Sequence, residues 1–225
     1  MGSRLAKGDS PTLQTMSESK LEGRMVEALR WRKADVSSIR SFNSILLQFP
    51  KIDNSLRKCM SIFDRFDEDS NETIDQEELR KCFHELNISF SEEEIAELFE
   101  LCDINKDKRI NFSEFIVLIC LVYLLKDDPS EQFVKMRMGM PDIEAALETL
   151  VNAFLFLDKN RDGYVTKSEM VQAINESGEH SSGRIALKRF EEMDWDKNGM
   201  VNFKEFLFAF IRWVGIDDPD EEDDQ

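Results

Sequence analysis

Residues 158–169 read DKNRDGYVTKSE, with an oxygen-bearing side chain at nearly every other position and a glycine in the middle. Calcium takes about six to eight oxygens, and a loop of about twelve residues can supply them from positions 1, 3, 5, 7, 9 and 12. Here these positions hold Asp158, Asn160, Asp162, Tyr164 through its carbonyl, Thr166 and Glu169. Gly163 at position 6 suits the positive φ of the sharp turn. The stretch therefore predicts a calcium loop.

A second stretch, DWDKNGMVNFKE at residues 194–205, matches the same pattern completely, with Gly199 at position 6. Its predicted ligands are Asp194, Asp196, Asn198, Met200 through its carbonyl, Asn202 and Glu205. Val165 and Val201, both at position 8, are apolar, as expected of a short strand by which the two loops pair.

Two upstream stretches keep every ligand position but lose the glycine. DEDSNETIDQEE at residues 67–78 offers Asp67, Asp69, Asn71, Thr73, Asp75 and Glu78. DINKDKRINFSE at residues 103–114 offers Asp103, Asn105, Asp107, Arg109, Asn111 and Glu114. In chain order we call the four stretches the first, second, third and fourth loops.

Position 6 of the first and second loops holds Glu72 and Lys108. A side chain held there at positive φ costs about 1 kcal/mol. Lys108 and Arg109 also add positive charge beside the second site. We therefore expect the third and fourth loops to bind Ca²⁺ most tightly and the second most weakly, with up to four ions bound and Mg²⁺ as a competitor.

The loops begin at residues 67, 103, 158 and 194, so two pairs with the same internal spacing follow one another. Apolar residues recur at three- and four-residue spacing on both sides of each loop, which predicts flanking helices. Position 9 is Asp, Asn or Thr with Glu three residues later, so it is expected to cap the outgoing helix. The predicted fold is all-α, with two lobes of helix-loop-helix pairs and short β pairing between loops.

On these motifs the chain resembles the EF-hand superfamily over about residues 56–215, with a plan similar to calmodulin and most like the plant calmodulin-like proteins. The resemblance implies paired EF-hands and calcium binding. The chain departs from calmodulin in its longer connection between lobes, in the missing glycines of its first two loops and in a basic leader.

The chain divides into five expected segments: a partly disordered basic extension (1–52), an N-terminal pair (53–125), a linker (126–141), a C-terminal pair (142–216) and an acidic tail (217–225). Gly139 and Pro141 disfavour one unbroken helix between the lobes. The methionines of the linker are either a contact surface for a partner or part of a packed or flexible connection. They are Met136, Met138 and Met140.

In the leader, Ser19 and Glu22 form a capping-box pattern ahead of a basic amphipathic helix that contains Trp31. Its apolar side is expected to hold Met25, Ala28, Leu29, Val36, Ile39 and Leu46. Two roles stay open: the helix docks in a calcium-opened groove as an internal target, or it packs permanently on the N-terminal lobe. Gly2 after Met1 suggests N-myristoylation, although Ala6 departs from the motif.

The formal charge is −17 and is unevenly distributed. Lys and Arg number 11 against 6 Asp and Glu through Lys58, and 18 against 40 afterwards. An acidic body makes nucleic acid an unexpected partner. The four cysteines fall among apolar residues without a CxxC pair, as in reduced intracellular proteins. No secretory or membrane-spanning segment is predicted, so we expect a cytoplasmic or nuclear protein that reaches membranes only if Gly2 is acylated.

Two functions fit these features. One is a monomeric calcium sensor, in which ion binding exposes an apolar groove that grips an amphipathic helix of a target protein. The other is a constitutively bound subunit of the calcineurin-B type that uses calcium mainly for folding. An enzyme is not expected, because His84 and His180 have no nucleophile at meaningful spacing and calcium ligation accounts for the acidic clusters.

Overall fold

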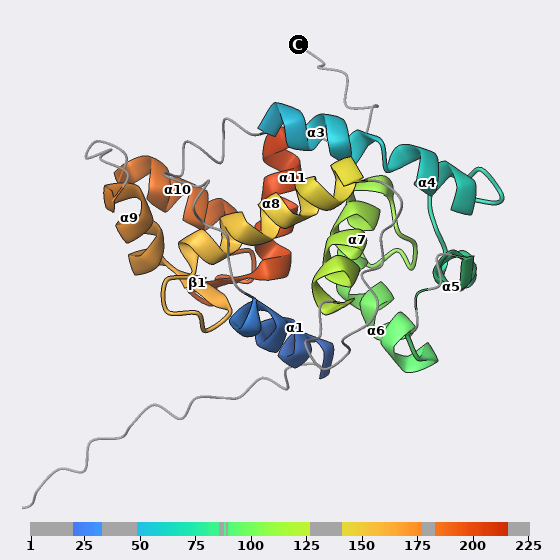
Figure 1. Cartoon of the computed structure of the whole chain (residues 1–225), viewed down its shortest axis with the longest axis horizontal. Helices are drawn as coiled ribbons and strands as arrows, with labels where there is room; N and C mark the ends of the chain where they lie inside the picture. Colours follow the sequence, from blue (N-terminus) through green and yellow to red (C-terminus); the bar gives the residue numbers. More distant parts are fainter. Residues whose placement is uncertain are drawn as a thin grey trace, which may run out of the picture.

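The computed structural model describes residues 20–32, 49–85, 88, 90–126, 141–176 and 183–215, which are helical apart from short loops and two short strands (Figure 1). Four helix-loop-helix units account for most of this. They are α4 (Met60–Phe66) with α5 (Gln76–Glu85), α6 (Glu92–Cys102) with α7 (Phe112–Lys126), α8 (Pro141–Leu157) with α9 (Lys167–Glu176), and α10 (Gly183–Met193) with α11 (Phe203–Val214). Two further helices precede them, α1 (Lys20–Trp31) and α3 (Phe49–Arg57). The predicted all-α class is confirmed.

Local sequence sets several helix ends. Ser91 opens α6 with a capping box, since its hydroxyl accepts from the Glu94 N–H at 3.2 Å while the Glu94 carboxylate accepts from the Ser91 N–H at 2.8 Å. Helix α8 begins at Pro141, and a proline is well tolerated at the first helical position, where a missing N–H does no harm. Gly215 ends α11 at a φ of +76°, in the left-handed conformation that suits glycine.

Within each pair the loops are joined through their position-8 residues. Ile74 and Ile110 exchange two backbone hydrogen bonds, at 2.8 and 2.9 Å. In the second pair the contact lengthens into antiparallel strands β1 (Tyr164–Thr166) and β2 (Met200–Asn202), with Val165 opposite Val201. The predicted pairing of the third and fourth loops is therefore confirmed.

The two pairs also have equivalent clusters of aromatic rings in their cores. The Phe63 ring meets the edges of Phe112 and Phe115, with centroids 5.6 and 5.4 Å apart. The equivalent residues of the second pair are Phe154, Phe203 and Phe206, which occupy the same places relative to their loops. The centroid of the Phe154 ring lies 5.2 Å from that of Phe203 and 5.5 Å from that of Phe206. Such edge-to-face contacts add about 0.5–1.5 kcal/mol each beyond burial. One sequence pattern thus builds the same aromatic centre twice.

The two pairs share one hydrophobic core. Helix α7 of the first pair packs on α11 of the second, and α3 lies along α8 on one side of the molecule (Figure 1). An ion pair between Lys58 and Asp142 and a hydrogen bond of 3.0 Å from Arg57 to the Gly215 carbonyl connect the same region. Because α3 begins at Phe49, ordered structure that packs on the second pair starts inside the segment assigned to the extension.

Helix α1 (blue in Figure 1) packs on α6 and α7 through Leu21, Met25 and Leu29, all nearly inaccessible. The predicted amphipathic helix is therefore present around Met25 and Leu29, while Trp31 is 69% exposed. This is the arrangement expected if the leader packs on the first lobe.

All four cysteines are free and buried, as predicted. No helix in the described ranges is long and apolar enough to cross a membrane. Ala28 of the predicted apolar side is partly buried against the core. Several predictions lie outside the described residues: the Ser19 cap, acylation of Gly2, the apolar positions Val36, Ile39 and Leu46, the linker methionines, His180 and the acidic tail.

Candidate metal centres

In each loop, the side chain of the first residue accepts a backbone hydrogen bond that closes the turn. One carboxylate oxygen of Asp67 accepts from the backbone N–H of Glu72, five residues on, at 2.8 Å. The same contact occurs in the other loops. The pairs are Asp103 with Lys108 at 3.0 Å, Asp158 with Gly163 at 2.9 Å and Asp194 with Gly199 at 3.1 Å. The side chain at position 1 therefore faces the inside of the turn in all four loops, as a residue that binds a metal ion there must.

The backbone at position 6 takes a positive φ in every loop, whether or not it is glycine. Gly163 and Gly199 lie at +91° and +85°, and Glu72 and Lys108 at +64° and +66°. The strain predicted for the first two loops is thus present. Position 4 is also left-handed in every loop, which the sequence did not indicate. Those residues are Ser70, Lys106, Arg161 and Lys197, with φ between 56° and 60°.

The glutamate at position 12 reaches back from the first turn of the outgoing helix to both ends of its loop. In the second loop, Glu114 accepts from the N–H of Ile104 and of Asn111, both at 3.0 Å. Glu78, Glu169 and Glu205 make the same pair of contacts, to positions 2 and 9 of their own loops, at 2.8–3.3 Å. All four glutamates are buried, so each outgoing helix is tied to its loop by one inward-facing carboxylate.

Position 9 caps each outgoing helix, as predicted. The side chains of Asp75, Asn111 and Asn202 accept from the N–H of position 12 at 2.9 Å, and Thr166 does so at 3.3 Å. Asn202 and Glu205 complete a capping box. Helix capping and metal ligation therefore use the same residues.

Side chains at position 5 accept from the N–H of position 7. These contacts are Asn71 to Thr73, Asp107 to Arg109, Asp162 to Tyr164, and Asn198 to Met200, at 2.8–2.9 Å. They hold the peptide of position 7 against the loop. That its carbonyl ligates an ion stays a prediction.

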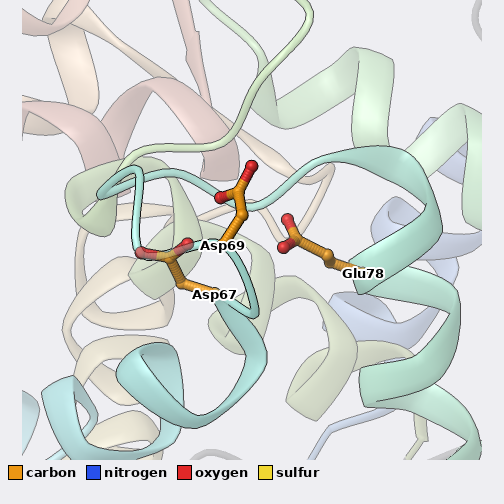
Figure 2. Close-up of side chains that lie close together, drawn as sticks. All are labelled: Asp67, Asp69 and Glu78. Carbon is orange, nitrogen blue, oxygen red and sulfur yellow. The ribbon is translucent and has the colours of Figure 1, made fainter.

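Carboxylate oxygens converge most closely in the first and fourth loops. Ligand atoms of Asp67, Asp69 and Glu78 lie within 4.8 Å of one another, and Figure 2 shows these side chains gathered inside the curve of the loop. In the fourth loop, ligand atoms of Asp194, Asp196 and Glu205 also lie within 4.8 Å of one another. In the second and third loops position 3 is an asparagine, Asn105 or Asn160, so an amide oxygen takes the place of one carboxylate.

Burial makes these carboxylates unfavourable as bare anions. In the described part of the chain every buried Asp or Glu occupies position 1 or 12 of a loop. Burial raises the pKa of Asp158, of Glu114 and of Glu205 above their ordinary values, and neighbouring Asp162 adds to the effect at Asp158. Buried charges are stable only when they are paired or bind a metal.

The donor set fits a hard cation. Every predicted ligand atom is an oxygen from a carboxylate, amide, hydroxyl or carbonyl, the ligands that Ca²⁺ prefers, with the inward aspartates and glutamates supplying negative charge. The residues present therefore suit calcium in all four loops.

Comparison with known proteins agrees with this geometry. Residues 56–120 and 147–211 match the family described as the EF-hand domain pair. The chain is 60% identical over 218 residues to the probable calcium-binding protein CML21 of Arabidopsis thaliana, covering 97% of this chain and 94% of that protein. It is 43% identical to the probable calcium-binding protein CML22 of the same plant, over 91% of each. Calcium-dependent protein kinase 17 of Arabidopsis thaliana is 32% identical over 70% of this chain but only 26% of the kinase.

Proposed function

The chain belongs to the EF-hand domain pair family, and from this premise we propose that it is a calcium sensor that binds Ca²⁺ in up to four loops and regulates a target protein. The observation that carries the proposal is the common arrangement of the loops, in which positions 1 and 12 are turned inward and, with one exception at position 1, buried. When bound, calcium supplies the positive charge that these buried carboxylates need. The names of the two similar plant proteins support calcium as the ion.

The position-12 glutamates can convert ion binding in a loop into movement of the helix that follows it. Glu114 stands in the first turn of α7 and Glu205 in the first turn of α11. These two outgoing helices pack on each other across the boundary between the pairs. Any shift of either glutamate toward its loop centre moves a helix that forms this boundary. Calcium binding is therefore expected to change the contact between the pairs.

The surface released by such a change is apolar. On α11 the buried side chains include Phe210 and Ile211, and α7 is apolar along nearly its whole length. Separation of the pairs would offer these faces to a partner. Since the chain after Lys58 is strongly acidic, a basic amphipathic helix is the complementary target.

Calcium-dependent binding to a hydrophobic resin or an environment-sensitive dye tests the proposal. We expect retention with Ca²⁺, release with a chelator and little effect of Mg²⁺. The double variant Glu169→Gln/Glu205→Gln should lose most of the retention, because both position-12 ligands of the second pair are weakened. Equal retention of the native chain with and without calcium would contradict a sensor.

The alternative is a constitutively bound regulatory subunit of the calcineurin-B type. It is favoured by the single core, in which α1 and α3 already lie on the two pairs. A subunit of this kind should gain stability from calcium without exposing apolar surface. Thermal unfolding with and without calcium, alongside the resin assay, separates the two roles.

A further inference from the structure

Helix α1 lies outside both EF-hand pairs, yet it touches the third loop at its turn. A Cβ placed on Gly163, at position 6, would lie 2.9 Å from Val26 Cγ1, 3.0 Å from Cγ2 and 3.2 Å from Cβ. Four residues along α1, and so on the same side of the helix, the Arg30 guanidinium donates to the Asp162 carbonyl at 3.2 Å. The contacts therefore fall on positions 5 and 6, at the back of the loop.

The end of α1 is held by both pairs. Arg32 forms an ion pair of 3.0 Å with Glu148 of α8, and its guanidinium lies 4.8 Å from the ring centre of Tyr123 on α7. The Arg32 side chain is only 10% exposed, so the arginine side of this pair is largely removed from solvent. From the third loop, Arg161 donates to the Arg32 carbonyl at 3.4 Å. Arg32, at the end of α1, therefore contacts α7, α8 and the third loop.

The other side of α1 is fixed to the first pair. Leu21, Met25 and Leu29 are buried against it, the Leu21 N–H donates to Glu97 of α6 at 3.0 Å, and Arg24 forms an ion pair with Glu94. One face of α1 therefore packs on the first pair, and the neighbouring face, with Val26 and Arg30, contacts the third loop. The helix thus connects the first pair to the third loop.

In the described part of the chain, nothing packs on position 6 of the fourth loop in this way. Gly199 has a φ of +85°, close to that of Gly163, but a Cβ placed on it would meet nothing within 4 Å. The two loops otherwise share their curling and capping contacts. The chain therefore contains a matched pair of loops, one braced by α1 and one not.

We propose that Val26 and Arg30 are positioning residues for the third loop and that α1 sets the calcium affinity of this loop from outside the EF-hand pairs. The inference rests on the proposed calcium binding and adds a regulator to it. Asp162 is the position-5 ligand, and the buried Gly163 N–H donates to the position-1 carboxylate of Asp158. Holding this backbone in place reduces the ordering that ion binding requires. Because α1 also packs on α6 and α7, the state of the first pair reaches the third loop.

The test compares Gly163→Ala with Gly199→Ala in the full chain, by calcium titration calorimetry. Within the second pair, Glu205→Gln leaves the third loop as the strong site and Glu169→Gln leaves the fourth, while Glu78→Gln and Glu114→Gln in every protein silence the first pair. Both alanines suffer similar strain at positive φ, which weakens binding about fivefold to tenfold. Gly163→Ala should weaken its loop by a further factor of about five, because the stiff side chain of Val26 cannot rotate out of the way.

Val26→Ala supplies the decisive comparison. It should rescue the additional loss in Gly163→Ala and leave Gly199→Ala unchanged, a result that general unfolding of α1 cannot produce. In otherwise native protein, Val26→Ala and Arg30→Gln should each weaken the third loop about threefold to tenfold, the range for one lost contact or hydrogen bond. They should also speed amide exchange at Gly163 in metal-free protein. The exposed Glu27→Ala on the same helix is the control.

Equal losses of calcium affinity in Gly163→Ala and Gly199→Ala, with no rescue by Val26→Ala, would overturn the proposal that α1 positions the third loop. A rise in calcium affinity with Val26→Ala would also overturn it, because α1 would then hold the loop in a weak-binding form. Absence of calcium binding by every loop would instead refute the proposed function, so the two failures are distinguishable.

Discussion

The Tyr123 hydroxyl donates a hydrogen bond of 2.8 Å to the carboxylate of Glu148, joining the last helix of the first pair to the first helix of the second. The same carboxylate pairs with Arg32 at the end of α1. One glutamate thus connects three helices that belong to three separate segments of the sequence.

Tyr123→Phe should lower the free energy of unfolding by about 0.5–1.5 kcal/mol, the net value of one hydrogen bond, without changing the fold. Glu148→Gln should be more damaging, because it removes the negative charge that pairs with the largely buried Arg32 guanidinium. Urea unfolding of the metal-free protein measures both. The exposed ion pair of Arg65 with Glu85 is the control, since Glu85→Gln should change stability by less than about 1 kcal/mol. Equal losses at Glu148 and Glu85 would mean that the junction is unimportant.

Lys108→Gly should tighten the second loop about fivefold to tenfold, because it relieves a side chain held at a φ of +66°. Lys108→Ala removes the same charge but keeps the backbone strain, so it separates the two causes. Calcium calorimetry of the three proteins gives the comparison. If both variants gain equally, charge rather than backbone conformation weakens this loop.

Glu205→Gln should remove a tight calcium site, whereas Glu114→Gln should remove a weak one. Both glutamates make the same two backbone contacts, so the difference arises from position 6 and from the charges of Lys108 and Arg109. Terbium luminescence follows the fourth loop directly, since Trp195 stands at its second position and is 52% exposed. An unaltered high-affinity phase in Glu205→Gln would show that the predicted order of the loops is wrong.

The cysteines should resist thiol reagents in the folded protein. Burial raises the pKa of Cys59 and of Cys82 to about 12, and it raises the pKa of Cys102 and of Cys120 as well. The reactive species is the thiolate, so at mildly alkaline pH almost none is present. A chromogenic disulfide reagent should label fewer than one thiol per chain in native protein and all four after denaturation. Fast labelling of native protein would require an opening that the structure does not contain.

The sequence predicted those parts of the molecule that depend on local spacing. The inward turn of the acidic residues at positions 1 and 12, the caps at position 9 and the apolar position 8 through which Val165 and Val201 pair all follow from the order of residues within each twelve-residue loop. The left-handed φ at position 4 was missed, because Ser70, Lys106, Arg161 and Lys197 carry no compositional sign of it.

Contacts between distant segments were also missed. Nothing in the leader indicates that Val26 meets Gly163, since their proximity depends on how α1 packs against both pairs at once. For the same reason the sequence accounts for the glycine at position 6 by its backbone conformation alone. In the structure Gly163 is also required by lack of space, a constraint that Gly199 does not share.

Removal of residues 1–32 should weaken calcium binding by the third loop and lower the free energy of unfolding, because Leu21, Met25 and Leu29 no longer cover the first pair. The cut leaves α3 intact, whereas a deletion to residue 52 would remove the start of a helix that packs on α8. Removal of residues 1–18, which keeps α1 and the Ser19 predicted to cap it, is the matched control and should change neither quantity. Calcium calorimetry and urea unfolding measure the two effects, and Trp31 emission in the intact chain reports whether calcium moves the helix. A truncated chain that binds calcium more tightly than the control would mean that α1 opposes ion binding, and identical titrations would leave it only a structural part.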